Sequence, residues 1–421
     1  LYGMADLFII GQFEGVAATT AVSVGSQVMH MLTVILVGLA MGATVSVGQA
    51  VGAKNNRQAA GCVGNTVTLF LALSVVLTGL LLLLARPVVL VMSTPQQAVS
   101  GTVAYLTVCF LGIPFITAYN IISAIFRGMG DSKTPMFFIA VACAANIGLD
   151  YLFIGFLHLG PAGAALGTTL AQAISVAVAL VTVKKRRLGL ALTKADFKPQ
   201  RRLMAPILKV GLPIALQDGL IQIAFILITV IANGRGLNDA AAVGIVEKII
   251  SFLFLFPSPS FSAFSALGAQ SFGAGKPQRA KATLGYAVLI AGAFGLVVSV
   301  FMQFFAAQTV GLFTASKTVA AAGGQYLRGY VWDCVFAGIH FSFSGYFCAC
   351  QKSGLSFMHN IIAIVCMRVP GVYVTSKLYP GSLLPMGLAT AAGSLISVLI
   401  CVVAFGVLNK NEKAVLAGGA E

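Results

Sequence analysis

Asp150 stands inside the apolar run NIGLDYLFIGF, where a carboxylate requires a specific partner because water is scarce. Asn146 precedes Asp150 by four residues, so in a helix the amide and the carboxyl project from one face. Tyr2 and Asp6 repeat this spacing near the start of the chain, and Thr168 adds a hydroxyl. Two carboxyls with an amide, a phenol and a hydroxyl nearby could bind Na⁺ through oxygen atoms, or hold a proton on one carboxyl.

A purely structural role is the alternative for each acid. Asp150 could be a permanently satisfied residue bonded to Asn146 and to backbone, because acids in membranes also pair for packing. Asp6 lies only five residues before Gly11 and could instead sit at the membrane interface.

The chain contains only eleven acidic residues, so their positions are informative. Five fall within apolar helices, where an ionisable side chain is by default a candidate for an ion or substrate path. Those of the second half are Asp218, Glu247 and Asp333. We expect solvent to explain the other six, which fall in loops or in the tail: Glu14, Asp131, Asp196, Asp239, Glu412 and Glu421.

The acids of the second half leave two interpretations open. Asp218 together with Asp333 is the predicted ion or substrate site of this half, with Glu247 as a further candidate. Glu247 could instead pair with a basic partner such as Lys248 or Arg368, whereas Asp333 is less easily neutralised within its own helix.

Composition identifies the chain as a membrane protein, since 58% of its 421 residues are hydrophobic and 9% are charged. Apolar stretches of about 20 residues, long enough to cross a bilayer, recur along nearly the whole chain, so neither a signal peptide nor a single anchor explains them. The net charge of +15 lies in short clusters between apolar runs, which favours a membrane surface over nucleic acid as a partner. We expect a monomer in the lipid bilayer.

Apolar runs bounded by Gly, Pro and charge predict an all-α polytopic protein with twelve transmembrane helices, the first of them truncated. Pro114, Pro257, Pro259 and Pro370 fall within these helices and should bend them. The predicted helices span about 1–11, 17–50, 58–85, 97–127, 134–157, 161–183, 206–233, 240–272, 279–304, 320–350, 355–379 and 383–408.

The longest polar connection, the basic linker 184–205, separates an N-lobe of helices 1 to 6 (1–183) from a C-lobe of helices 7 to 12 with a tail (206–421). Lys and Arg concentrate in this linker and in alternate loops, while the opposite loops are nearly bare. Short cytoplasmic loops retain basic residues, so the linker and both chain ends should be cytoplasmic, in the cell inner (plasma) membrane.

The two halves resemble each other at a constant shift of 221 residues, as GQAVGAKNNRQA and GAQSFGAGKPQRA illustrate. Both halves begin on the same side, so the repeat is parallel, and two facing six-helix lobes should enclose a cleft. At this shift Asp150 corresponds to Gly371 and Asn146 to Met367, so the second half lacks the pair. The counterpart of the seventh helix should start roughly 15 residues before Leu1, so we expect the chain to begin inside its first helix.

The sequence lacks the motifs of several common enzyme and ATP-binding sites. In GAQSFGA, the nearest approach to a phosphate loop, Ala274 stands where lysine is required, and neither H-E-x-x-H nor G-x-S-x-G occurs. ATP-driven transport and the commonest hydrolases are therefore unsupported, and we expect no enzyme and no cofactor. The eight cysteines lie mostly in apolar runs and the four histidines share no spacing, so no metal is expected beyond possible Na⁺ at Asp6 and Asp150.

The whole chain resembles the prokaryotic branch of the multidrug and toxic compound extrusion (MATE) family. The resemblance is carried, in order, by MADLFIIGQFEG, GLAMGATVSVGQAVGAKN, FRGMGDSKTPMF, NIGLDYLF and GLPIALQDGL. It implies a secondary active multidrug antiporter that exports cationic amphipathic compounds in exchange for H⁺ or Na⁺, by alternating access of two lobes.

The resemblance also implies a cation site. Asp6 matches the aspartate of the family's first helix, and Tyr2 matches the tyrosine one turn before it. Asn146 and Asp150 match the pair of the fifth helix, and Thr168 the threonine of the sixth.

In another branch of the family, the cation site lies in the second lobe and uses a glutamate of the seventh helix and an aspartate of the tenth. Asp333 fits the aspartate, but the acid of the seventh helix here is Asp218, which lies closer to the proline than in that pattern.

Two other functions compete with an antiporter. A lipid-linked oligosaccharide flippase of the same superfamily should carry several basic residues in its cleft, whereas here intramembrane acids outnumber Lys248 and Arg368. An intramembrane aspartyl hydrolase would also use two acids, but its G-x-G-D is absent, since Asp150 follows IGL.

Overall fold

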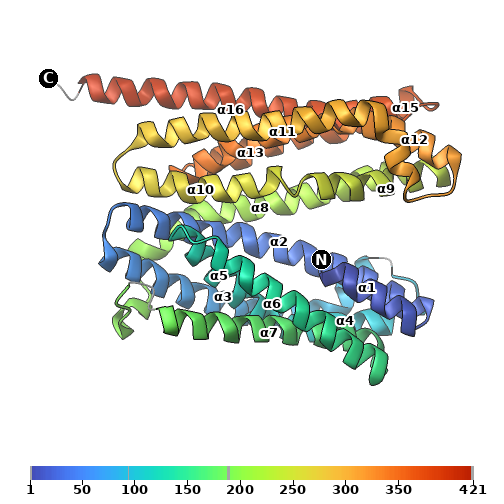
Figure 1. The fold of residues 1–421 in the computed structure, drawn as a ribbon, viewed down its shortest axis with the longest axis horizontal. Helices are drawn as coiled ribbons and strands as arrows, with labels where there is room; N and C mark the ends of the chain where they lie inside the picture. The colour runs from blue at the N-terminus through green and yellow to red at the C-terminus, as the bar shows by residue number, and fades with distance from the viewer. Residues whose placement is uncertain (1, 93, 187–189, 419–421) are drawn as a thin grey trace. The chain divides into compact units, whose positions relative to one another are not determined.

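The computed structural model describes residues 2–92, 94–186 and 190–418, with side chains at 5–92, 94–185 and 190–410. Within these ranges the regular structure is entirely helical, which confirms the predicted all-α class. The chain divides into two compact units, Leu1–Leu208 (unit 1) and Lys209–Glu421 (unit 2), which are described separately. In Figure 1, unit 1 is coloured blue to green and unit 2 yellow-green to red.

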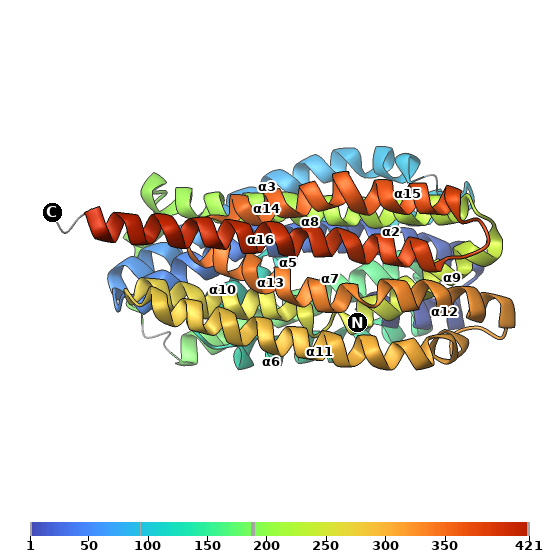
Figure 2. The same ribbon diagram turned by 90° about the horizontal axis from the view of Figure 1, so that it is seen from above.

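Unit 1 is a bundle of long helices that run roughly along a common direction (Figure 1), and Figure 2 shows that the helices of unit 2 also run roughly along one another. α2 packs against α3, α4 and α5, and α6 packs along α7. Its elements are α1 (Tyr2–Phe13), α2 (Val16–Gly52), α3 (Asn56–Val91), α4 (Val99–Leu111), α5 (Ile113–Gly128), α6 (Lys133–Asp150), the π-helix η1 (Tyr151–Phe156), α7 (Gly160–Arg186) and the 3₁₀ turn η2 (Lys194–Phe197).

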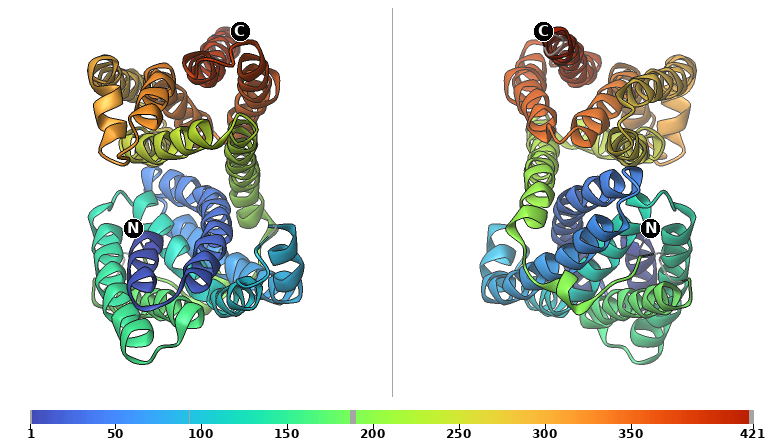
Figure 3. Two further views of the ribbon diagram at one scale, coloured as in Figure 1. Left: turned by 90° about the vertical axis from the view of Figure 1, so that its right-hand side faces the viewer. Right: turned by 90° about the vertical axis from the view of Figure 1, so that its left-hand side faces the viewer.

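Unit 2 has the same kind of architecture, and the end views of Figure 3 show each bundle along its helix axes. Its helices begin with α8 (Arg201–Asn233), whose first turns belong to unit 1. The others are α9 (Leu237–Leu253), α10 (Pro257–Gly273), α11 (Pro277–Gly311), α12 (Lys317–Tyr330), α13 (Asp333–Ala349), α14 (Ser353–Ala363), the π-helix η3 (Ile364–Arg368), α15 (Val369–Leu378) and α16 (Leu384–Gly418).

Helix boundaries repeat between the units at the shift of 221 residues. α2 begins at Val16 and ends at Gly52, while the pair α9 and α10 begins at Leu237 and ends at Gly273. α3 and α11 start at the same shift, and each unit contains one π-helix. The two units thus use one helical plan.

Several predicted spans are interrupted, mostly where proline occurs. The span predicted at 97–127 is bent by 49° between α4 and α5, where Pro114 occupies the first turn of α5. Pro257 begins α10 after a break, and Pro370 follows η3. In the described part of the chain, nine helices are long and apolar enough to cross a membrane, and the bent pair makes a tenth. α1, with 12 residues, and the pair α12 and α13 complete the twelve predicted segments.

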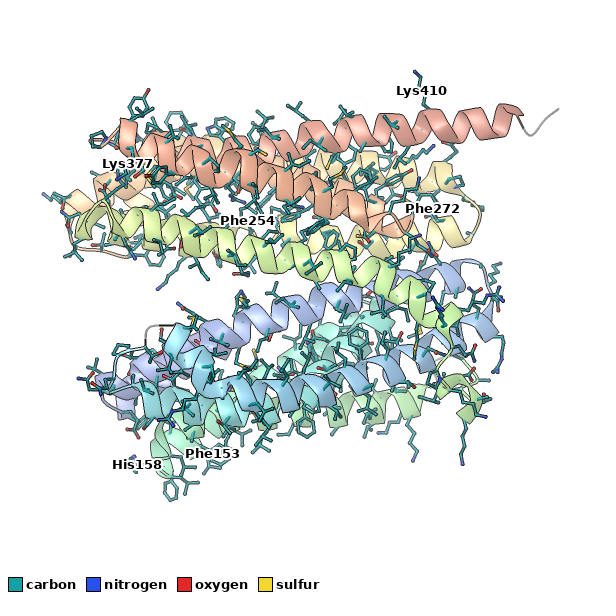
Figure 4. The ribbon with its side chains drawn as sticks, turned by 180° about the vertical axis from the view of Figure 1, so that it is seen from behind. Phe153, His158, Phe254, Phe272, Lys377 and Lys410 are labelled. Atoms are coloured by element: carbon teal, nitrogen blue, oxygen red, sulfur yellow. The ribbon has the colours of Figure 1, made fainter. Side chains whose placement is uncertain are left out.

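Apolar side chains cover much of the outer surface, as expected of a lipid-facing protein. Figure 4 shows Lys377 of α15 and Lys410 of α16 toward opposite ends of unit 2. Phe254 lies between these ends, at the break between α9 and α10.

The connection before α8 is docked on α3. Asp196 is only 2% exposed, and its carboxylate accepts the Thr193 N–H at 2.8 Å and pairs with Arg57 at 3.1 Å. These hydrogen bonds from Thr193, with the charge of Arg57, lower the pKa of Asp196. Asn65 donates to the Asp196 carbonyl at 3.0 Å and accepts the Gln200 N–H at 2.7 Å. The prediction that the charge of Asp196 is stabilised by solvent is therefore wrong, because the protein itself supplies its partners.

Candidate cation site

Three helices of unit 1 bring predicted polar residues together. α1 contacts α6, η1 and α7. Asp6 comes from α1, Asn146 and Asp150 from the last two turns of α6, and Thr168 from α7. Asp6 is 1% exposed, and both Asn146 and Asp150 are 0% exposed, so the cluster is buried inside the unit.

Asn146 and Thr168 both donate hydrogen bonds to Asp6. The distance from Asn146 Nδ2 to Asp6 Oδ1 is 3.2 Å, and that from Thr168 Oγ1 to Asp6 Oδ2 is 3.0 Å. Asn146 Nδ2 also lies 3.4 Å from Thr168 Oγ1. The two oxygens of Asp6 are thus held by side chains of two other helices, which fixes α1 against α6 and α7.

Asp150 lies beside this cluster without a donor of its own. Its carboxyl interacts with the Asp6 carboxyl and with Asn146, yet neither of its oxygens accepts a hydrogen bond of ordinary geometry from the described groups. Asn146 Oδ1 also lacks a donor there. Two carboxyls can hydrogen-bond only when they share a proton; when both are ionised, a cation is needed between them. The cluster therefore offers three buried oxygens to a proton or a Na⁺ ion.

The close approach of α7 to Asp150 depends on Gly167. A Cβ atom at this position would collide with Asp150 Oδ1. Thr168, the next residue, reaches Asp6 from the same turn. Small residues allow such close helix contacts in membranes. The run GAALGTTLAQ therefore contributes to the site in two ways: Gly167 leaves room for Asp150, and Thr168 supplies a hydroxyl.

The helix changes type immediately after Asp150. η1 forms one π turn over Tyr151–Phe156, and such insertions in α-helices are frequent at functional sites. Tyr151 packs edge-on against Phe13 at the end of α1, with ring centroids 6.2 Å apart. α6 is therefore joined to α1 both through the acids and through this aromatic contact.

No basic side chain among the described residues pairs with Asp6 or Asp150. Their surroundings include the buried residues Tyr105 and Cys109, whose interactions with Asp6 are electrostatic. Tyr2 belongs to α1, but its side chain lies outside the described residues, and its role stays a prediction.

Of the acids predicted for the second half, Asp333 and Glu247 both interact with Arg368, whereas Asp218 lies elsewhere. Asp333 pairs with Arg368 at 2.8 Å. Glu247 accepts a hydrogen bond from Thr229 Oγ1 at 3.3 Å and feels the charge of Arg368. Asp218 lies near Cys348, whose thiol feels its charge. Cys348 is 15 residues, or about 22 Å of helix, beyond the start of α13, where Asp333 stands.

Unit 2 also contains a buried pair of histidines that the sequence did not predict. His340 on α13 and His359 on α14 have ring centroids 5.5 Å apart, and His359 Nε2 lies 2.9 Å from Ser344 Oγ. Their sequence spacing follows no motif because the two residues come from different helices. The described residues contain no group of three or more side chains suited to a transition metal.

A polytopic helical scaffold with buried acids on separate helices is typical of a membrane transporter. The family model MatE matches residues 1–152 and 213–374, and the chain belongs to this family of multidrug efflux transporters, whose members are not enzymes.

Similar proteins agree with this assignment. "Probable multidrug resistance protein YoeA" of Bacillus subtilis is 26% identical over 94% of this chain and 87% of that protein. "Multidrug export protein MepA" of Staphylococcus aureus is 22% identical over 90% of this chain and 84% of that protein. The solved "Crystal structure of MATE in the bent conformation" has a TM-score of 0.91 at 23% identity and covers 100% of this chain and 93% of that one. The predicted family and fold class are confirmed.

Proposed function

We propose that the protein is a secondary active antiporter that exports cationic amphipathic compounds in exchange for H⁺ or Na⁺. Asp6 and Asp150 form the coupling site, with Asn146 and Thr168 as supporting ligands and Tyr2 as a further predicted member. The observation that carries this proposal is the contact between two buried carboxyls from different helices, without a basic partner among the described side chains.

Cation occupancy changes the energy of this contact. With a proton or Na⁺ bound, the carboxyls attract a shared partner and hold α1 against α6. Without it, two like charges about 4 Å apart repel each other by about 4 kcal/mol at an effective dielectric constant of about 20. This energy corresponds to a shift of roughly a thousandfold in an equilibrium between two arrangements of α1.

Coupling follows if the two arrangements differ in their affinity for the exported compound. An ion can shift a conformational equilibrium only by its differential affinity for the two states. Asp6 supports this proposal because its carboxyl accepts hydrogen bonds from α6 and α7, so a change in its charge would change how α1 packs against them. Loading of the cation would then favour release of the compound to the outside.

The protein acts in the cell inner (plasma) membrane, with both chain ends in the cytoplasm. The basic linker and Lys410 lie in the cytoplasmic set of loops predicted by the positive-inside rule, and Lys377 lies in the opposite set. The separation of Lys377 and Lys410 along unit 2 agrees with this orientation.

Transport of a fluorescent cationic dye in proteoliposomes tests the proposal, with proton and sodium gradients imposed separately. We expect one of the two gradients to drive dye movement in the wild type, and Asp150→Asn and Asp6→Asn to remove the response to it. Glu14→Gln, at the turn after α1, is the matched control and should retain the response, since Glu14 has no contact with the site acids.

Gradient-driven dye transport that survives Asp150→Asn would contradict the assigned site. Wild-type transport that responds to neither gradient would contradict ion antiport itself. The ion that drives transport would identify which ligand the free oxygens of Asp150 and Asn146 bind.

A further inference from the structure

Arg368 places a permanent positive charge inside unit 2. Its side chain is 12% exposed, and that of its partner Asp333 is 1% exposed. A guanidinium remains charged at every physiological pH, so a carboxylate must accompany it in a buried position. Asp333 provides this carboxylate, with a distance of 2.8 Å from Arg368 Nη2 to Asp333 Oδ2.

The guanidinium of Arg368 is held in one place from several helices. Nη2 donates to the Tyr330 hydroxyl at 3.2 Å, and Cζ lies 5.5 Å from the ring centroid of Phe225 on α8 and 5.9 Å from that of Tyr330. α16 approaches closely at Gly393, where a Cβ atom would lie 2.9 Å from Arg368 Cβ. Aromatic faces and a carboxylate are the groups that bind organic cations, and here they bind one from the chain itself.

The other titratable groups described around this pair are one acid, one imidazole, two phenols and the Cys334 thiol. Glu247 on α9 interacts with Arg368 electrostatically and accepts the Thr229 hydroxyl. His340 and Tyr326 also lie in the field of Arg368, and Ser394 of α16 lies beside Asp333. The guanidinium of Arg368 therefore interacts with two acids, and it forms its direct ion pair with Asp333.

We propose that Arg368 is a tethered cation that occupies the ion position of Asp333, withdraws this acid from coupling and confines the coupling site to unit 1. This inference rests on the proposed antiport and specifies which intramembrane acids take part in it. Arg368 is thus a residue that determines how many ions the transporter couples.

A tethered cation outcompetes free ions because its entropy of association has already been lost on folding. A proton or Na⁺ ion would have to displace a rigidly held group that also bonds Tyr330 and stacks on Phe225. Removing the guanidinium while keeping Asp333 would leave this buried carboxyl without its fixed cation. An external cation would then be required.

The experiment measures the ion-to-dye ratio from the balance point, the dye gradient at which a fixed ion gradient produces no net flux. Arg368→Gln should couple one additional ion, so that a tenfold ion gradient balances a dye gradient roughly tenfold steeper than in the wild type. The neutral pair Asp333→Asn with Arg368→Gln should return to the wild-type balance point. Arg368→Lys, which keeps the charge, should also match the wild type.

A double variant that has lost coupling would overturn the inference, because Asp333 would then carry the transported ion itself. A wild-type balance point for Arg368→Gln would also overturn the inference, since it would show that Arg368 does not keep Asp333 from coupling an ion. If the single variant does not fold, loss of coupling in the double variant still overturns the inference. Failure of the antiport proposal is detected separately, by the gradient-driven dye transport of the wild type and of Asp150→Asn.

Discussion

The two units build similar helical bundles and neutralise their buried acids in opposite ways. In unit 1, Asp6 and Asp150 face each other, and the described residues supply hydroxyl and amide partners but no base. In unit 2, Asp333 faces Arg368. A shared helical plan therefore fixes where side chains can meet, but the residues at those places decide whether a buried acid meets a base or another acid.

The corresponding position in unit 2 shows what replaced the acid pair. Gly371 stands at the counterpart of Asp150, and a Cβ atom there would lie 3.3 Å from Ala389 Cβ and 3.9 Å from Met367. Ala389 and Met367 are themselves the counterparts of Thr168 and Asn146 at the shift of 221. The same spatial neighbourhood is thus preserved, while every oxygen ligand in it has become apolar.

The largest expected effect is on the free energy of unfolding, which the same Asp→Asn change should alter differently in the two units. Asp333→Asn should lower the free energy of unfolding by about 3–5 kcal/mol, because it leaves a buried guanidinium without its carboxylate. Asp150→Asn should leave that stability unchanged or raise it, because it removes a neighbour of like charge. Denaturation of the purified proteins in one detergent measures both; an equal loss in the two variants would erase the distinction between the units.

The second effect concerns the space beside the unpartnered acid. Gly167→Ala should reduce gradient-driven dye transport by roughly 10- to 100-fold, since overpacking against Asp150 costs about 1–3 kcal/mol at the ion site. Gly148→Ala on α6 is the control, because a Cβ there meets nothing within 4 Å. Equal transport rates for the two variants would show that the position of Asp150 is not critical.

A smaller effect separates two neighbouring hydroxyls on α7. Thr168→Val removes the donor to Asp6 and should weaken the apparent affinity for the driving ion by roughly tenfold, the equivalent of about 1.5 kcal/mol. Thr169→Val should change it little, because the buried Thr169 hydroxyl has no partner among the described groups. The ion dependence of dye transport gives both affinities, and a reversed order would argue against Thr168 as a ligand.

The smallest effect lies outside the bundle interiors, at the connection docked on α3. Because its native partners lower the pKa of Asp196, the stabilisation it provides is complete above the ordinary pKa of 3.8 and is lost as the pH falls below that value. Asp196→Asn should remove this acid-dependent step. Hydrogen exchange at residues 190–200 as a function of pH measures it, and protection that stays constant down to pH values well below 3.8 would contradict the role of Asp196.

Much of the scaffold could be predicted from the sequence because a membrane leaves few options. Each apolar run must satisfy its own backbone in a helix, and a proline removes a donor, so Pro114 and Pro257 mark interruptions. The break between α12 and α13 has no proline and was not predicted. Neither π-helix had a recognisable signal, since both occur in ordinary apolar sequence.

The site could be predicted only where its members share a helix. Asn146 and Asp150 follow from a spacing of four, whereas residue types alone left the meeting of Asp6 and Thr168 with this pair a hypothesis, which the family resemblance then favoured. The pairing of Asp333 with Arg368 spans 35 residues and two helices, so only the fold could select Arg368 as its partner. Local patterns thus predict faces of helices, and tertiary packing decides which faces meet.

The most direct test is to count the cations taken up by the purified protein in nanodiscs, using proton uptake on acidification and calorimetric titration with Na⁺. A coupling site confined to Asp6 and Asp150 predicts that Asp150→Asn takes up one cation fewer than the wild type, and that the neutral pair Asp333→Asn with Arg368→Gln takes up the same number as the wild type. Unchanged uptake in Asp150→Asn, or a lost cation in the neutral pair, would contradict it.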